Sequence, residues 1–555
     1  MNDEKLPKRN ANPERDAYRD QTGAKRAERA LTAFAQDFAR ESSDADAGEA
    51  HLHRRIYSWL RAAILDGVLP GGMRLPPGRT LAVQLGVSRN TVTNAFDQLL
   101  AEGFIEGRPG SGTFVVELPT ARGARDVAAR KNPARTPRNA GRSTQNTIGA
   151  SRRGTTLAAL RATRSRSFTT TVAFGPGIPA LDCFPYDEFA RLTTKVYREL
   201  SATPAFFGYA APGGVPELRE AIAMHLRIDR GVRCEARQIV VVNGSQQGLD
   251  LCARILLDPG DVAFVEDPGY LGARGALGAA GARIVGVPVD AQTGLDLNAL
   301  KKIWRAKNQR ALIYITPSHQ FPFGMTMSLA QRLELLDFAR ESGLWILEDD
   351  YDSEYRYTGR PISALQGLDE SGEQVVYVGT FSKVLAPGLR LGYLVLPPHL
   401  VDAFVTVRAL LDRQPAAVTQ LAVARLMNGG GFHRHLRRMR DLYIERRAAL
   451  LAGIDALPGR PLRALPTDTG LFVTATFAPE YLTSHAKSKL AARAGRPLDQ
   501  VISERAAAVG VDLPALSNYY LRPDSPASLH GFLFGFASYD VAEMREGFRK
   551  LARIL

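Results

Sequence analysis

The chain has 555 residues, which is too long for a single hydrophobic core and predicts at least two domains. Its content of 45% hydrophobic and 23% charged residues is ordinary for a globular protein, and no apolar run is long enough to span a membrane. Three cysteines without a recognisable spacing predict neither a disulfide framework nor a metal site. The charged N-terminus lacks the apolar stretch of a secretion signal, so we expect a cytoplasmic protein.

The net charge of +14 is concentrated in one segment. Residues 118–166 contain twelve Lys or Arg residues and a single acidic residue, Asp126, and are poor in aromatic residues. This composition predicts a flexible basic linker, which either follows DNA phosphates or is a solvated tether. Residues 1–50 are polar and lack apolar periodicity except for a possible helix near 27–40, and we expect a disordered extension there.

Residues 51–117 alternate helical patterns with Gly and Pro residues and end in a Gly-rich hairpin. Apolar residues at helical spacing predict three helices, with these inward positions: Leu52, Ile56, Leu60 and Ile64; Leu81, Ala82 and Leu85; Val92, Ala95, Phe96 and Leu99. Gly86 permits the turn between the last two helices, and Ser88 is suited to cap the third. The pattern predicts a helix-turn-helix followed by a two-stranded wing.

The start of the third helix is expected to face DNA, with Arg89, Asn90, Thr91 and Thr93 pointing outward. Arginine can bond guanine with two hydrogen bonds, and asparagine can read adenine. The stretches DGVLPGGMRLPPGRTLAVQLGVSRNTV and RPGSGTFV resemble the winged helix of GntR-type regulators. This resemblance implies DNA contacts from Arg79, Ser88, Arg89, Asn90, Thr91 and Gly110, although Pro77 stands where that family commonly has a hydroxyl residue.

Residues 167–555 carry seven short apolar runs between helical segments, at 238–242, 261–265, 283–287, 311–315, 344–348, 374–378 and 389–396. Such runs predict an α/β fold with a mainly parallel sheet that is covered on both faces. The remainder, from about residue 398, has longer helices and a few strands, which predicts a smaller C-terminal α+β lobe.

Four stretches at successive strand ends suit the binding of pyridoxal phosphate. Lys383 can form an imine with the aldehyde of this cofactor, and Asp349 can hold a proton on the pyridine nitrogen. Tyr351 could reach the phenolic oxygen, and Tyr270 could stack on the ring. The phosphate would be bound by the helix start and by nearby side chains, namely Gly244, Ser245, Gln246, Arg390, Thr380 and Ser382.

Each stretch alone also fits a solvated turn, a capped helix or a metal-binding loop, and only the complete set favours the cofactor. The set resembles the fold-type-I aminotransferases, through FGYAAPGGVPELREAIAMHL, TPSHQFPFG and LEDDYDSEYRY. Together with the winged helix, the chain resembles the MocR/GabR subfamily of GntR-type regulators. This resemblance implies a double-stranded DNA operator, a head-to-tail homodimer, and Tyr209 reaching the cofactor phosphate of the partner subunit.

Four departures from the patterns of aminotransferases and of the subfamily bear on the function of the chain. Phe321 precedes Pro322 where aminotransferases have asparagine, and His319 or Gln320 could replace it. The late strand GFLFGFASY lacks the arginine that holds a substrate carboxylate, for which Arg522 is a candidate. Residues 484–500 have the character of an insertion. Gly272 stands where the subfamily's GABA sensor has arginine, with Arg274 nearby, which disfavours GABA as the effector.

We therefore expect a transcriptional regulator whose effector, an amine or amino acid, forms an external aldimine by displacing Lys383. One alternative is an active aminotransferase with a fused DNA-binding module, and a second is a sensor of pyridoxal phosphate itself. The first alternative predicts sustained turnover, and the second predicts operator binding that responds to the cofactor alone.

Overall fold

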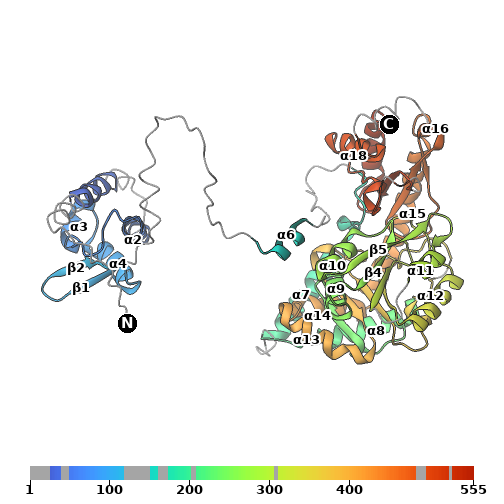
Figure 1. Cartoon of the computed structure of the whole chain (residues 1–555), viewed down its shortest axis with the longest axis horizontal. Coiled ribbons are helices and arrows are strands. Elements are labelled where there is room, and N and C mark those ends of the chain that lie inside the picture. Colours follow the sequence, from blue (N-terminus) through green and yellow to red (C-terminus); the bar gives the residue numbers. More distant parts are fainter. Residues whose placement is uncertain are drawn as a thin grey trace, which may run out of the picture. The chain divides into compact units, whose positions relative to one another are not determined.

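A computed structural model describes residues 25–38, 49–117, 150–159, 173–201, 208–304, 310–359, 361–482, 495–523, 525 and 528–555. The chain divides into two compact units, Met1–Thr147 and Ile148–Leu555, each with its own hydrophobic core (Figure 1). Most of the predicted basic linker, 118–149 and 160–166, lies outside the described residues. Among the described residues, no helix is both long and apolar enough to cross a membrane.

The first unit has the predicted helix-turn-helix and wing. Its elements are α2 (Glu49–Leu65), α3 (Gly78–Leu85), α4 (Arg89–Ala101), β1 (Ile105–Arg108) and β2 (Gly112–Val115). Gly86 ends α3 with φ of 67°, and the Ser88 hydroxyl accepts a 3.1 Å hydrogen bond from the Thr91 N–H at the start of α4. A cap of this kind contributes about 1 kcal/mol. The inward residues of α3 and α4 are buried as predicted, with Phe96 only partly covered.

A further helix over residues 25–38 belongs to the same core, and it changes the predicted boundary at residue 50. Ala27, Leu31, Ala35 and Phe38 recur at helical spacing and are buried with the apolar face of α2. Phe34 stacks on Trp59 of α2, with ring centroids 4.0 Å apart. The helix expected near residues 27–40 is therefore present over residues 25–38. It packs in the core of the first unit and is not part of a disordered extension.

The second unit is built on an eight-stranded sheet with the order β3-β10-β9-β8-β7-β4-β5-β6. All seven predicted runs form strands of this sheet, and the short β6 completes it. The strands are β3 (Ile239–Val242), β4 (Val262–Asp267), β5 (Arg283–Asp290), β6 (Gly294–Leu295), β7 (Ala311–Ile315), β8 (Trp345–Asp350), β9 (Val375–Thr380) and β10 (Gly392–Val395). Strands β5, β4, β7, β8 and β9 are parallel, whereas β10 is antiparallel to both β9 and β3.

Helices cover both faces of this sheet, which explains why its strands are apolar without alternation. On one face, Val240 and Val242 pack with α9 (Ser245–Leu256), α10 (Leu271–Ala280) and α13 (Val401–Asp412). On the other face, Ile239 and Val241 pack with α7 (Tyr186–Ser201), α8 (Pro216–Arg230) and α14 (Ala417–Asn428). Farther along that face the sheet packs with α11 (Leu297–Ile303) and α12 (Leu329–Ser342).

The C-terminal part forms the predicted smaller lobe. The long helix α15 (Gly431–Asp455) leads to an antiparallel sheet of β11 (Leu462–Ala464), β12 (Phe472–Phe477) and β13 (Gly531–Gly535), with α16 (Pro479–Leu482), α18 (Leu498–Ala508) and α19 (Val541–Leu551) around it (Figure 1). Within the range predicted as linker, residues 152–159 form α6, and Arg153 donates a 3.3 Å hydrogen bond to the Ala279 carbonyl of α10. These linker residues therefore belong to the second unit.

Candidate cofactor cavity and DNA-binding surface

The carboxyl ends of β3, β4, β7, β8 and β9 lie at one edge of the large sheet, and the loops that follow them surround a cavity of about 1110 Å³. Ligands commonly bind at this edge of an open α/β sheet. Nine of the eleven residues predicted to contact the cofactor line the cavity: Ser245, Gln246, Tyr270, Asp349, Tyr351, Thr380, Ser382, Lys383 and Arg390. The other two are Gly244, which contacts Arg390, and Tyr209, which lies elsewhere.

Lys383 follows β9 and reaches across the cavity to the Gly177 carbonyl, to which its Nζ donates a 2.5 Å hydrogen bond. Burial lowers the pKa of this amine, while Asp352 and Asp349 act in the opposite direction. A lower pKa increases the fraction of neutral amine, which is the form that attacks an aldehyde. A Cβ at Gly177 would lie 3.0 Å from Nζ, so glycine leaves the space that the lysine occupies.

Asp349 lies near the end of β8 and is 4% exposed. Its Oδ2 accepts a 2.7 Å hydrogen bond from the Tyr314 hydroxyl on β7, whereas Oδ1 has no hydrogen-bond partner among the described residues. Burial raises the pKa of Asp349 to about 7, with a contribution from the neighbouring Asp350 and against the effect of Tyr314. A buried carboxylate with one free oxygen can accept a bond from a protonated ring nitrogen, so the site fits a pyridine cofactor.

The predicted phosphate end lies where β3 passes into α9. Gly244 precedes the helix with φ of 91°, and its carbonyl accepts from the N–H groups of Gln247 and Gly248 at 3.2 and 3.4 Å. The N–H groups of Ser245 and Gln246, at the very start of the helix, have no preceding turn to supply an acceptor. Arg390 donates a 2.9 Å hydrogen bond from Nη2 to the Asn243 carbonyl. A Cβ on Gly244 would lie 2.9 Å from this guanidinium, so a larger residue would displace it. Thr380 and Ser382 line the same cavity, and the Thr380 hydroxyl accepts from the Ser382 N–H at 3.1 Å.

The opposite end contains a polar cluster that the sequence did not reveal. The Tyr351 hydroxyl donates a 2.8 Å hydrogen bond to the His319 carbonyl and lies 3.1 Å from His319 Nδ1, which is itself 2.9 Å from Asp352 Oδ1. Burial raises the pKa of Tyr351 well above its usual value. Tyr351 and Asp352 line the cavity. His319 is not one of the lining residues, and its Nδ1 contacts both of these side chains.

The loop after β7 places Phe321 in the cavity wall, with its ring edge-to-face to Tyr270 at 5.7 Å between centroids. The side-chain amide of Gln320 forms hydrogen bonds with backbone groups. Its Nε2 donates to the carbonyls of Phe321 and Pro268, and its Oε1 accepts from the Phe323 N–H. Neither Gln320 nor His319 is among the residues that line the cavity, whereas Phe321 is.

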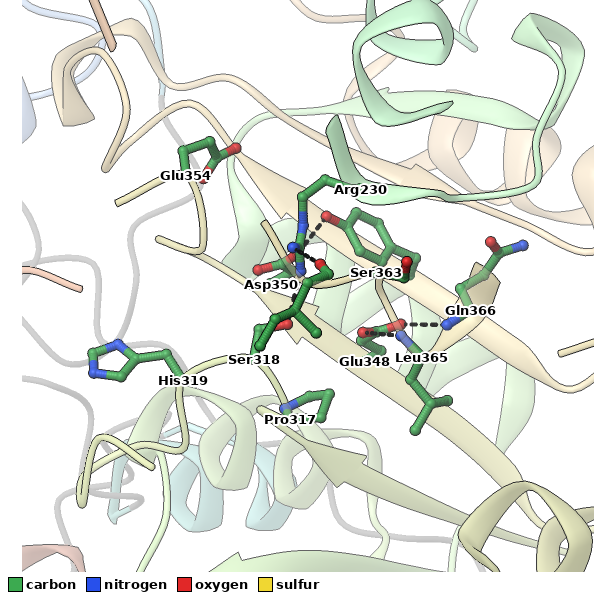
Figure 2. A network of polar contacts seen from close by, with 12 residues as sticks. Arg230, Pro317, Ser318, His319, Glu348, Asp350, Glu354, Ser363, Leu365 and Gln366 are labelled. Atoms are coloured by element: carbon green, nitrogen blue, oxygen red, sulfur yellow. Dashed lines mark hydrogen bonds and ion pairs between the residues drawn. The ribbon is translucent and has the colours of Figure 1, made fainter. Parts of the chain in front are cut away.

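A buried network connects this loop to the strand that carries Asp349 (Figure 2). Arg230, at the end of α8, lies 2.7 Å from Asp350 Oδ2 and donates a 2.8 Å hydrogen bond to the Ser318 hydroxyl. The Tyr377 hydroxyl donates to the same Asp350 oxygen at 2.8 Å. Glu348 lies two residues before Asp350 on β8, so its side chain is on the same face of the strand. It accepts hydrogen bonds from the N–H groups of Leu365 and Gln366, both at 2.8 Å. These bonds hold the strand end and the loop beside it in one geometry.

Neither Arg522, the candidate for binding a carboxylate, nor Arg274, which is near Gly272 in sequence, is among the residues that line the cavity. Arg522 is exposed, and Arg274 binds the Tyr519 carbonyl and lies 3.4 Å from Asp267 Oδ1. The cavity is instead lined by Arg496, which forms two hydrogen bonds with Glu504, at 2.5 and 2.7 Å. Arg496 lies in residues 484–500, the segment interpreted as an insertion. The search for an arginine was made on the late strand, so it did not reach Arg496.

The residues predicted to contact DNA come from α3, the start of α4 and the wing, and all of them except one are exposed. Arg79, Ser88, Arg89, Asn90 and the wing residue Gly110 are exposed, and Gly110 has φ of 71° at the wing tip. Thr91 is instead 2% exposed, and its hydroxyl lies 2.8 Å from that of Ser88. The prediction that Thr91 faces outward is wrong, because the third residue after the cap turns toward the core and completes the cap.

Two family models match the chain: bacterial regulatory proteins of the gntR family over residues 52–115, and aminotransferase class I and II over residues 184–508. The probable rhizopine catabolism regulatory protein MocR of Rhizobium meliloti is 40% identical, over 92% of this chain and 94% of that protein. The pyridoxine biosynthesis regulator PdxR of Corynebacterium glutamicum is 30% identical over 88% of this chain and 92% of its own length.

Among solved structures, the second unit resembles the α-aminoadipate aminotransferase LysN of Thermus thermophilus, complexed with N-(5'-phosphopyridoxyl)-L-leucine. The TM-score is 0.60 at 27% identity, over 70% of this chain and 92% of that one. The predicted architecture is thereby confirmed: an N-terminal winged helix is joined to a fold-type-I aminotransferase domain. The chain belongs to the MocR-type subfamily of GntR-family transcriptional regulators.

Proposed function

We propose that this chain is a DNA-binding regulator that holds pyridoxal 5'-phosphate at Lys383 and senses an amine or amino acid there. One observation carries the proposal: the Lys383 amine and the unpaired Oδ1 of Asp349 line the same cavity. When bound, the cofactor would supply an aldehyde that reacts reversibly with primary amines, either that of Lys383 or that of the effector.

The residues of the chain then have separate roles. Asp349 would accept the ring N–H, and Tyr314 would keep that carboxylate oriented. Arg390, Ser245, Gln246, Thr380 and Ser382 would bind the phosphate, while Tyr270 and Phe321 would shield the ring from water. Tyr351 would hydrogen-bond the phenolic oxygen, since its hydroxyl is already aligned by His319. Release of Lys383 by the effector would shift the balance between two arrangements of the DNA-binding units.

The contacts with DNA would come from the exposed residues of α4 and the wing. Arg89 and Asn90 would read bases, Arg79 and the tip around Gly110 would contact the backbone, and Thr91 would only position Ser88. Tyr209 is 85% exposed, and the Arg413 guanidinium lies 5.2 Å from its ring centroid. Tyr209 is not among the residues that line the cavity of its own subunit, which supports a head-to-tail homodimer in which Tyr209 completes the site of the partner subunit.

An active aminotransferase is the second candidate, because Lys383 and Asp349 would serve transamination equally well. Two observations favour the sensor. Strand β13 has the sequence GFLFG, which provides no arginine for a substrate carboxylate, and Arg496 is already paired with Glu504. The effector carboxylate, if there is one, would have to displace Glu504 from Arg496.

The test combines absorbance and turnover on the purified full-length chain. An amine effector should shift the absorbance of the bound cofactor and change the affinity for operator DNA, without sustained production of keto acid from any amino donor. Arg496→Met should weaken the response to an effector that carries a carboxylate while the response to simple amines remains. Sustained turnover with an amino donor and a keto acid would contradict the sensor proposal and support the enzyme.

A further inference from the structure

A second cavity, of about 230 Å³, lies apart from the cofactor cavity and has a different set of lining residues. It is bounded by α8, α15, residues 353–359 and Pro361, and it contains His225, Asp229, Glu354 and His433. Arg230, the last residue of α8, lines this cavity on one side and joins the Asp350 network on the other (Figure 2).

Three of these side chains converge as metal ligands do. His225 and Asp229 are one helical turn apart on α8 and therefore share a face, and His433 approaches them from α15. One ligand atom from each of the three lies within 4.8 Å of the others. The separations are 2.7 Å from His225 Nδ1 to Asp229 Oδ2 and 3.8 Å from His433 Nδ1 to the same oxygen. The ligand atoms around a tetrahedral zinc ion are about 3.3 Å from one another. Small rotations of these three side chains would bring their ligand atoms to that separation.

The environment of His225 provides an independent indication. This side chain is 5% exposed, and it lies between two carboxylates: its Nδ1 is 2.7 Å from Asp229 Oδ2, without the alignment of a regular hydrogen bond. Its Nε2 lies 3.7 Å from Glu354 Oε1, on the side away from Asp229. Histidines that bind metals through one nitrogen typically present the other to a carboxylate, which is the arrangement seen here.

The charges around the cavity determine what else it would hold. Arg356, Arg437 and Arg440 also line it, and Arg440 donates a 2.8 Å hydrogen bond to the Glu354 carbonyl. Their positive charge opposes a cation, but it favours an anion beside one. Three protein ligands leave the fourth position of a tetrahedral ion open, and these arginines would attract hydroxide, chloride or a carboxylate to that position.

We propose that His225, Asp229 and His433 form a binding site for a divalent transition metal ion, with zinc(II) the ion that best matches two imidazoles and a carboxylate. Glu354 orients His225 from behind, and the fourth position faces the cavity. The cysteine pattern, which predicted no metal site, carries no information about this one, because its ligands come from two helices far apart in sequence.

The test uses tag-free full-length protein and zinc(II) chloride. After equilibrium dialysis, we expect one zinc ion per chain. His433→Gln and Asp229→Asn, which change partly exposed side chains, should each weaken zinc binding by about tenfold or more, and Glu354→Gln by about tenfold. His399→Gln is the matched control, because His399 is an exposed histidine outside the cavity, and it should leave zinc binding unchanged.

Circular dichroism establishes that each variant is folded before its affinity is compared. Absence of retained zinc, or retention that is unchanged in either His433→Gln or Asp229→Asn, would overturn the proposal. Cobalt(II) provides a second measurement on the unmodified protein. A visible band of the intensity expected for four-coordinate cobalt, abolished by one equivalent of zinc, is the predicted result, and its absence would also overturn the proposal.

Discussion

The hydroxyl of Tyr314 on β7 donates a 2.7 Å hydrogen bond to Oδ2 of Asp349 on β8 and thereby holds a buried carboxylate at the edge of the cavity. The other oxygen, Oδ1, has no hydrogen-bond partner among the described residues. The parallel pairing of these strands creates the relationship, because Tyr314 lies opposite Leu347, two residues before Asp349. A cofactor with a protonated ring nitrogen would satisfy the free oxygen.

The stability of the cofactor-free protein should depend on the protonation of Asp349. Its pKa is about 7 in the folded chain against a usual value of 3.8, mainly because of burial. The folded state therefore retains a proton that the unfolded state releases, and the free energy of unfolding should fall as pH rises from about 4 to about 7, by at most about 4 kcal/mol. Asp349→Asn should reduce this slope, as measured by urea unfolding at several pH values.

Tyr314→Phe is a second variant for that experiment, and it should change the pH profile without removing the carboxyl group of Asp349. It removes the hydrogen bond that favours the ionised form of Asp349, so the pH at which stability is lost should move upward. Identical pH profiles for the unmodified chain and Asp349→Asn would show that this carboxyl group is not the one responsible.

The Arg230–Asp350 pair should be costly to break. Both side chains are almost fully buried, and Asp350 is also bonded to Tyr377. Arg230→Met leaves this carboxylate buried without its charge partner and should lower the free energy of unfolding of the second unit by about 3–5 kcal/mol. The exposed pair Arg340–Asp337 offers the comparison: Arg340→Met should cost less than about 1 kcal/mol. Similar effects of the two changes in urea unfolding would contradict the role given to the network.

Thr91 and Asn90 are adjacent in sequence but should differ in their effect on DNA binding. Asn90 is exposed at the start of α4, so Asn90→Ala should weaken binding to a selected operator duplex by about tenfold or more and relax its base preference. Thr91→Ser keeps the hydroxyl near Ser88 and should leave operator affinity close to that of the unmodified chain. Fluorescence anisotropy at fixed salt measures both, and a larger effect of Thr91→Ser would contradict the assignment of Thr91 as a buried cap residue.

The helix over residues 25–38 should contribute to the stability of the DNA-binding unit. Phe34→Ala removes the stack on Trp59 and should destabilise this unit by about 1–3 kcal/mol. Fluorescence of Trp59 during urea unfolding reports on this unit, and Thr32→Ala, on an exposed position of the same helix, is the control. An unchanged unfolding midpoint in Phe34→Ala would indicate that the helix is dispensable.

Local patterns predicted the strands, most of the residues that line the cavity and the winged helix, because each depends on neighbours in sequence. Lys383, Asp349 and Gly244 all follow apolar runs, and the carboxyl ends of these strands meet wherever the sheet is parallel. The pairing of Arg496 with Glu504, the support of Tyr351 by His319 and the bond from Tyr314 to Asp349 depend on contacts between separate elements, which one sequence does not encode by spacing. Thr91 was misplaced for a different reason: the rotation of α4 is set by its packing on α2 and α3.

The absorbance spectrum of purified full-length protein with added pyridoxal 5'-phosphate tests most directly whether Lys383 holds the cofactor. We expect a band from an imine between the cofactor and Lys383. The band should survive removal of free cofactor, be lost in Lys383→Ala and be retained in the control Lys301→Ala, because Lys301 is exposed on α11. The band should shift when an effector amine is added. Persistence of the same band in Lys383→Ala would contradict the central claim that this lysine holds the cofactor.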